Sequence, residues 1–292
     1  METPGRRFRA LMDKSCLPVP GAFNALVARA VARAGFPACY VSGAATTVCA
    51  GVPDIGLLTL DHFARIIREA ADASGLPILA DADTGFGEEE MVRRTVVEYS
   101  RAGAAALHIE DQVFPKRCGH LDGKTLIPID QAVSKITWAA EAAKDLNNNF
   151  VICARTDARG VDGFDAAIDR ARAYANAGAD MIFPEGLTTE DEFARFAHAM
   201  TAAPKRPYLL ANMTEFGKTP IIPLARFADM GYHCVIFPVS LLRIAMGAVT
   251  RALETLRQDG SVQALLADMQ SRKDLYELIG YTPGTPWEYP VQ

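Results

Sequence analysis

The chain has 292 residues, half of them hydrophobic and 22% charged, so it can bury a large core and extended disorder is not expected. A net charge of −5 argues against a broad nucleic-acid surface. No apolar run approaches the roughly 18 residues of a membrane span, and no targeting peptide is recognisable at the start of the chain. Six cysteines without paired spacing favour a reducing cytoplasm.

Short β-rich runs alternate with amphipathic stretches along the chain. Eight strands are predicted, at Val19 to Ala22, Ala38 to Ser42, Ile78 to Asp81, Ala105 to Glu110, Val151 to Arg155, Met181 to Glu185, Tyr208 to Asn212 and Cys234 to Pro238. Helices are predicted at Leu60 to Ala73, Glu88 to Ala102, Gln131 to Ala143, Phe164 to Ala177 and Asp191 to Met200. The alternation predicts an α/β fold, a (βα)8 TIM-type barrel, with a doubly wound sheet as the alternative.

Two further helices, Leu241 to Arg257 and Ser261 to Ile279, are predicted after the eighth strand. A barrel needs only one of them. We therefore expect residues 1–258 to form a catalytic barrel and residues 259–292 to pack on a neighbouring subunit, with C-terminal helices exchanged in a homodimer or homotetramer. The tail from Tyr281 onward, rich in proline and aromatic residues, is expected to be irregular.

Most of the predicted strands end in a polar residue, and the carboxyl ends of barrel strands form the active-site face. The polar residues at or just after these ends are Ser42, Asp81, Asp83, Glu110, Arg155, Glu185, Asn212 and Arg243. Asp81 and Asp83 lie two positions apart, so both point to one side of an extended chain. With Glu110 or Glu185 they offer only oxygen ligands, which suits Mg²⁺ or Mn²⁺. The alternative is that Asp83 only caps a turn.

The run Lys116 to His120 combines two cations, a thiol, a glycine and an imidazole. We expect these surroundings to favour the thiolate of Cys118 and to make it an acid or base, although a lone cysteine is more often buried and inert. Arg155 is predicted to grip a substrate carboxylate, or to pair with Glu110 or Glu185, or both. Asn212 and Thr214 could hydrogen-bond a second carboxylate.

These motifs together resemble the isocitrate lyase and phosphoenolpyruvate mutase superfamily from about Phe8 to Tyr281. The resemblance rests on the motifs at residues 40–44, 53–54, 81–87, 108–112, 116–120, 154–157, 184–185 and 212–215. It implies Mg²⁺-dependent retro-aldol cleavage of a 2-hydroxytricarboxylate, with 2-methylisocitrate as the expected substrate and succinate and pyruvate as products.

The resemblance also implies a role for each matching residue. The metal would lie among Asp81, Asp83, Asp54 and Glu110, with Glu185 nearby, and Cys118 would deliver the proton to the succinate half. Tyr40 and Glu185 are the candidate bases. The substrate would contact Ser42, Gly43, Ala44, Cys118, Gly119, His120, Arg155, Glu185, Asn212, Met213, Thr214, Arg243 and Arg272.

Several alternatives stay open at this point. Relatives with the same Cys118 loop cleave 2,3-dimethylmalate, and isocitrate is a further possible substrate. A phosphonomutase or phosphonopyruvate hydrolase, or an oxaloacetate decarboxylase, would use the same metal and keto-acid site. Arg243, which would meet a third carboxylate, is the discriminating residue. A binding barrel without catalysis is disfavoured because thiol, acids and arginines map to one face.

Overall fold

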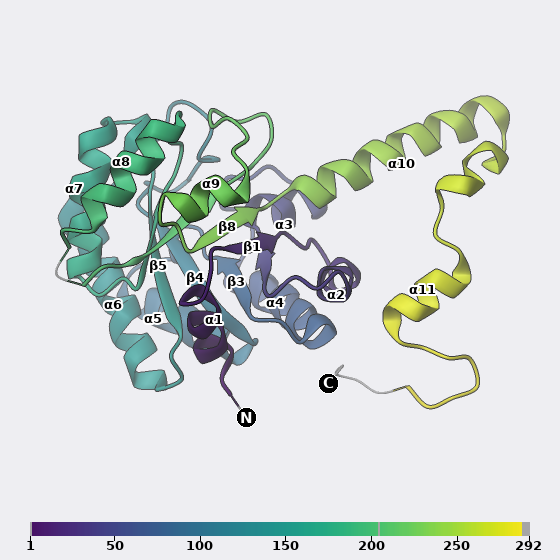
Figure 1. Ribbon diagram of the computed structural model, residues 1–292, viewed down its shortest axis with the longest axis horizontal. Coiled ribbons are helices and arrows are strands. Elements are labelled where there is room, and N and C mark those ends of the chain that lie inside the picture. Colours follow the sequence, from purple (N-terminus) through teal and green to yellow (C-terminus); the bar gives the residue numbers. More distant parts are fainter. Residues whose placement is uncertain (1, 204, 288–292) are drawn as a thin grey trace.

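The computed structural model of the protein describes residues 2–203 and 205–287. Its centre is a parallel sheet of eight strands with helices around it (Figure 1). The strands are β1 Leu17–Pro20, β2 Cys39–Val41, β3 Ile78–Asp81, β4 Ala104–Glu110, β5 Val151–Thr156, β6 Met181–Pro184, β7 Tyr208–Asn212 and β8 Cys234–Phe237. All eight predicted strands are confirmed, with ends that differ by two residues at most.

The sheet closes on itself. β1 pairs in parallel with β8, and the order continues from β8 down to β2 without a gap. The remaining seam, between β1 and β2, is joined by a parallel bridge between Gly21 and Tyr40 and by a 2.8 Å hydrogen bond from the Ala22 N–H to the Tyr40 carbonyl. The predicted barrel is therefore confirmed, and the doubly wound alternative is excluded.

Most of the helices cover the outside of the barrel (Figure 1). The helices of the structure are α1 Pro4–Met12, α2 Ala25–Arg33, α3 Gly43–Cys49, α4 Leu60–Ser74, α5 Glu89–Arg101, α6 Ile129–Leu146, α7 Phe164–Asn176, α8 Glu190–Met200, α9 Leu224–Asp229, α10 Ser240–Asp259 and α11 Arg272–Ile279, with 3-10 turns at Ala158–Gly160 and Gln263–Asp268. Gly35, Gly103 and Gly178, which follow α2, α5 and α7, have φ angles of +82°, +96° and +107°. Each of these glycines takes the left-handed conformation that ends a helix before a short loop to the next strand.

Buried side chains form two layers because neighbouring residues of a strand face opposite sides. Leu79 belongs to the cluster inside the barrel, whereas Ile78 and Ala80 pack against the surrounding helices. α1, which the sequence patterns did not predict, contributes Phe8 and Met12 to the interior cluster. The barrel is therefore filled, and its polar residues are concentrated at the mouth.

The C-terminal segment leaves the barrel along α10 and returns toward it with α11, which lies beside α2 (Figure 1). Arg29 and Arg33 of α2 donate to the carbonyls of Ile279 and Glu277. The single helix predicted from Ser261 to Ile279 is wrong: a 3-10 turn is followed by a new helix, which begins at a capping box made by Ser271 and Asp274. Part of the predicted irregular tail, residues 288–292, lies outside the described residues.

Within the described part of the chain, no helix is long and apolar enough to cross a bilayer.

Candidate active site

The polar residues predicted at the strand ends gather at the carboxyl-terminal mouth of the barrel. Two loops reach over this mouth. The first, residues 111–128, connects β4 to α6 and carries Cys118, and the second, residues 213–223, connects β7 to α9. The position follows from the fold, since all parallel strands of a barrel end at the same face.

Carboxylates and one lysine form the first half of the site. Lys116 Nζ lies 2.8 Å from Asp83 Oδ1 and also contacts Asp54. Asp81 accepts hydrogen bonds of 3.0 Å from the backbone N–H groups of Gly43 and Asp83. A side chain at Gly43 would overlap Asp81, so glycine is required for this close approach. Asp54 and Asp83 thus meet at the ammonium of Lys116, and Asp81 lies beside them through its bond to the Asp83 N–H.

Burial raises the pKa of Asp83 to about 6, and the neighbouring Asp81 acts in the same direction. For Asp81, burial also opposes ionisation, but the charges of Lys116 and Arg155 lower its pKa below the usual range. The pKa of Glu110 is raised well above its usual range, chiefly by burial. Carboxylates whose pKa values are shifted in opposite directions by burial and by neighbouring charges are typical of functional sites.

The acids fit a hydrated Mg²⁺ ion. Neither carboxylate oxygen of Asp83 or Glu110 accepts a hydrogen bond of good geometry, although Lys116 and Arg155 lie within ion-pair distance. No three described Asp, Glu, His or Cys side chains converge closely enough to coordinate an ion by themselves. Mg²⁺ does not require such a cage, because it is usually held by one or two carboxylates and keeps several waters.

Arg155 is buried at the end of β5 among carboxylates. Its Nε and Nη2 atoms donate to the two oxygens of Asp157 at 3.0 and 3.2 Å, and Nη1 lies 3.0 Å from Glu110 Oε2. Glu185 Oε2 is 3.8 Å from Nη2. Both predicted partners are therefore found. Asp157, which was not predicted as a partner, holds the guanidinium in a fixed bidentate geometry.

Glu185 directly follows β6 and accepts hydrogen bonds from His120 of the first covering loop and from Asn212 at the end of β7. His120 Nε2 lies 3.1 Å from Glu185 Oε1, and Asn212 Nδ2 donates to Oε2 at 3.1 Å. His120 Nδ1 accepts from the Lys218 N–H at 3.1 Å, which assigns the ring proton to Nε2. Burial opposes ionisation of Glu185, but Arg155 and His120 lower its pKa below the usual range.

Cys118 is half-buried beside this cluster. Burial raises the pKa of its thiol above the ordinary 9.0, and the negative charge of Glu185 adds to this effect. The expectation that the local surroundings favour the thiolate is therefore wrong, because Arg117 turns away and donates to the Asp122 carbonyl. Cys118 is a protonated thiol at neutral pH, which suits an acid rather than a nucleophile.

Tyr40 and His108 lie deeper in the barrel. The Tyr40 hydroxyl is 2.7 Å from His108 Nε2, so the buried histidine has a hydrogen-bond partner inside the barrel. Burial lowers the pKa of His108 to about 4, so its ring is neutral and its 3.6 Å approach to Asp81 is not an ion pair at neutral pH. Burial raises the pKa of Tyr40 well above 10.

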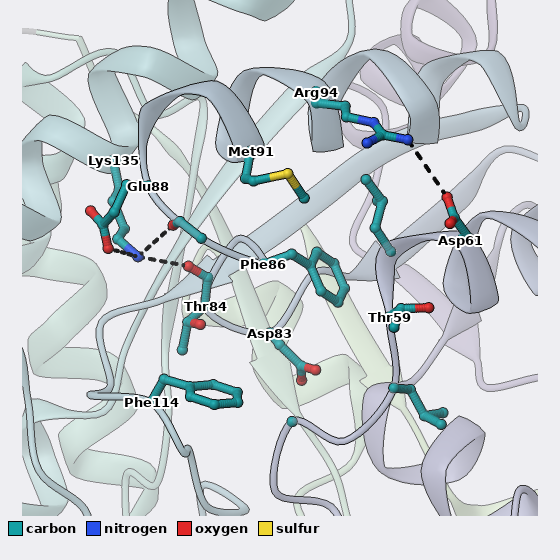
Figure 2. A pocket seen from close by; sticks show the side chains of 14 residues that line it. Thr59, Asp61, Asp83, Thr84, Phe86, Glu88, Met91, Arg94, Phe114 and Lys135 are labelled. Carbon is teal, nitrogen blue, oxygen red and sulfur yellow. Dashed lines mark hydrogen bonds and ion pairs between the residues drawn. The ribbon is translucent and has the colours of Figure 1, made fainter.

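A pocket of about 480 Å³ is lined by Asp83 together with residues of α4 and α5 (Figure 2). Phe86, Met91 and Phe114 contribute apolar walls. Its cations are already engaged: Lys135 Nζ donates to the carbonyls of Thr84 and Gly87, and Arg94 faces Asp61 at 3.9 Å. Such a pocket does not suit a substrate with several carboxylates, so we place the candidate site at the mouth of the barrel.

Comparison with known proteins agrees with this geometry. Residues 8–257 match the family described as phosphoenolpyruvate phosphomutase. A probable 2-methylisocitrate lyase of Corynebacterium glutamicum is 50% identical over 95% of this chain and 90% of its own, and a 2-methylisocitrate lyase of Aeropyrum pernix is 47% identical over 96% and 89%. The chain belongs to the phosphoenolpyruvate phosphomutase family.

Solved structures of the same superfamily share the fold. A 2,3-dimethylmalate lyase superposes with a TM-score of 0.89 and 37% identity over 96% of this chain and 92% of its own. A phosphonopyruvate hydrolase in complex with oxalate and Mg²⁺ gives a TM-score of 0.84 and 31% identity over 95% of each chain. The superfamily resemblance expected from the sequence is confirmed.

Not every residue that the family resemblance implied reaches the mouth through its side chain. Ser42 caps α3 through a 3.3 Å bond from the Ala45 N–H. Met213 is buried in the outer core, where its sulfur accepts from the Ile222 N–H. Arg243 contacts Glu215 and stacks over Phe216. Arg272 is exposed on α11, which packs on α2.

Sequence reasoning missed three residues that support the site. They are Gln112, Lys124 and Asp157, all buried. Asp157 directly follows β5, so its position at the strand end could have marked it as a site residue in the same way as Arg155. The partners of Gln112 and Lys124 depend on how the loop folds back on itself, which no local pattern reports.

Proposed function

We propose that the protein is a carbon–carbon lyase that cleaves 2-methylisocitrate to pyruvate and succinate. One observation carries the chemistry: a thiol kept protonated by burial lies on a loop that packs directly against Arg155 and ionised Glu185. The choice of substrate is supported by relatives of 47 and 50% identity that bear this activity in their names.

Cleavage requires removal of the proton of the C2 hydroxyl while the C2–C3 bond breaks. The electron pair of that bond goes to the succinate half, which takes a proton at carbon. Glu185 is proposed as the base, since its low pKa keeps it ionised, while Tyr40 keeps its own proton and is already bonded to His108. Cys118 is proposed to supply the carbon-bound proton.

The other residues bind and orient. Arg155, Asn212 and Thr214 are proposed to hold carboxylates of the succinate half, because the side chain of each carries a hydrogen-bond donor that a carboxylate can accept from. Asp81 and Asp83, with Asp54 and Glu110 nearby, are proposed to hold Mg²⁺, with Mn²⁺ as a substitute. When bound, the ion would polarise the keto group that forms at C2.

Cleavage of 2,3-dimethylmalate is the second candidate, and one observation favours it. The Arg243 guanidinium, proposed to meet the third carboxylate, is bonded to Glu215 and is partly exposed. If it keeps these contacts when substrate binds, a dicarboxylate would suit the site better.

The test is a product assay with purified protein and Mg²⁺ on 2-methylisocitrate, isocitrate, 2,3-dimethylmalate, oxaloacetate and phosphonopyruvate in parallel. We expect pyruvate and succinate in equal amounts from 2-methylisocitrate, and loss of this turnover after chelation. Turnover of 2,3-dimethylmalate alone would select the second candidate. Activity that is unaffected by complete chelation would refute the metal assignment.

We also propose a homodimer or homotetramer in the cytoplasm, with residues 1–258 as the catalytic barrel and residues 259–292 packed on a neighbour. The support is the apolar surface of α10, where Ile244 and Leu253 are 71% and 61% exposed. All six cysteines are free thiols, as expected in a reducing compartment.

A further inference from the structure

The backbone around Cys118 is held on both sides by buried side chains of its own loop. On the N-terminal side, the Gln112 amide donates to the Arg117 carbonyl at 2.8 Å and accepts from the Arg117 N–H at 2.9 Å. On the C-terminal side, Lys124 Nζ donates to the Gly119 carbonyl. The thiol therefore lies between two fixed peptide groups.

Lys124 differs from Gln112 because it also reaches outside the loop. Its ammonium lies 2.9 Å from Asp157 Oδ1, the same oxygen that accepts from Arg155 Nη2. The Lys124 side chain is 3% exposed, and Asp157 is fully buried. One ammonium thus joins the peptide next to the thiol to the carboxylate that fixes the guanidinium.

The surroundings are shaped to accept this ammonium. Gly160, in the 3-10 turn after β5, approaches it so closely that an added Cβ would lie 3.3 Å from Lys124 Nζ. Asp157 is held from the other side, because its N–H donates to Asp111 Oδ1 at 2.9 Å and Asp111 also accepts from Tyr174 at 2.7 Å. Asp157 therefore cannot follow Lys124 if the loop moves, and the bond between them breaks.

We propose that Lys124 is a positioning residue that fastens the Cys118 loop to the Arg155–Asp157 pair, so that the thiol and the carboxylate-binding guanidinium keep a fixed relative position. The expected effect on turnover rests on the proposed lyase function, whereas the expected effect on the Cys118 loop does not. Lys124 touches no reacting group itself. A buried lysine with two acceptors can hold the loop in place, because separating the Lys124 ammonium from Asp157 would leave a buried charge without a partner.

The structural test is alkylation of the Lys124→Met variant with iodoacetamide, followed by mass spectrometry of each cysteine peptide. We expect Cys118 to react at least about tenfold faster than in the wild type, because local opening exposes it. Cys39, Cys153 and Cys234, buried in the strands, should stay unreactive. Lys205→Met is the matched control, since it removes an exposed lysine paired with Asp180, and should leave Cys118 unchanged.

The catalytic test uses 2-methylisocitrate with the same variants. We expect kcat of Lys124→Met to fall about 100-fold with KM changed much less, because misplacing one reacting group costs roughly that factor. Unchanged Cys118 alkylation, or alkylation of the strand cysteines together with Cys118, would overturn the inference. If Cys118 of Lys124→Met is alkylated faster but the wild-type protein does not cleave 2-methylisocitrate, the role of Lys124 in holding the loop would stand and the proposed function would be refuted.

Discussion

At the scale of single residues, the chemistry of Cys118 is decided by its environment. Neighbouring cations in the sequence suggested a thiolate, but in the folded chain Arg117 bonds to a carbonyl and Lys116 is taken up by Asp54 and Asp83. Burial and the charge of Glu185 then raise the pKa of the thiol. The sequence shows which charged residues are adjacent to Cys118 along the chain, but not which of their side chains face its thiol.

This environment gives the first prediction, on Cys118→Ser. An alcohol is a far weaker acid than a thiol, so kcat on 2-methylisocitrate should fall by about 10²–10⁴-fold with the thermal midpoint nearly unchanged. Because the acid must be protonated and its pKa is raised from 9.0, wild-type turnover should lose this contribution only in alkaline solution above pH 9.0. The check is a kcat–pH profile, with exposed Cys49→Ser as control. Near-normal turnover of Cys118→Ser would remove the acid role.

At the scale of elements, the barrel was predictable because each strand repeats the same signals. β3 and β7 have the bounds expected from their apolar runs, and buried β4 and β5 differ from expectation by one residue. Polar strand ends at Asp81, Glu110 and Arg155 could therefore be placed at one mouth from sequence. The loop contacts could not, since they join residues such as Gly217 and His120, which lie far apart in the chain.

The seating of the Cys118 loop gives an element-scale prediction for Gly119→Ala. A Cβ at this position would overlap Glu185 and the Arg155 guanidinium, neither of which is free to move. The loop should lift by a fraction of an ångström or more, and kcat should fall about 100-fold, as expected for a misplaced reacting group. The thermal midpoint should change little, because the barrel core is not touched.

The control for this variant is Gly247→Ala in the exposed part of α10. A Cβ there meets only Arg251 Nη1 at 3.6 Å, an ordinary contact, and alanine should favour the helix by about 0.5–1 kcal/mol. Steady-state kinetics and thermal melts of both variants provide the check. Full activity of Gly119→Ala would mean that the loop is not seated on Glu185 and Arg155 during turnover.

At the scale of the whole molecule, the barrel and the C-terminal segment differ in how they are stabilised. The barrel is closed and filled by buried side chains, whereas among the residues of α10 only Leu242 is buried. A helix that exposes large apolar side chains to solvent is typical of a protein–protein interface. The two extra helices were predicted from the pattern of residues 241–257 and 261–279. The break at Met269–Ser271 was not predicted, because the capping box of Ser271 and Asp274 starts a new helix inside the second of these stretches.

Arg272 makes this architecture testable. It is exposed on α11, which packs on α2 outside the barrel (Figure 1). If it binds substrate, as the family resemblance implies, it must do so in another subunit. Cys118→Ser and Arg272→Ala should then each inactivate the homo-oligomer, whereas mixed oligomers of the two should regain activity, because one barrel of each pair receives both native residues.

The measurement is turnover of co-expressed, doubly tagged and sequentially purified mixed oligomers, compared with each variant alone. In a mixed dimer with exchanged helices, one of two sites is complete, so about half of the wild-type kcat per oligomer is expected. If α11 serves its own barrel, both sites lack one residue and the mixture stays inactive. Full activity of Arg272→Ala alone, or a monomeric mass by light scattering at micromolar concentration, would contradict exchange, since the C-terminal segment would then contribute nothing to a neighbouring site.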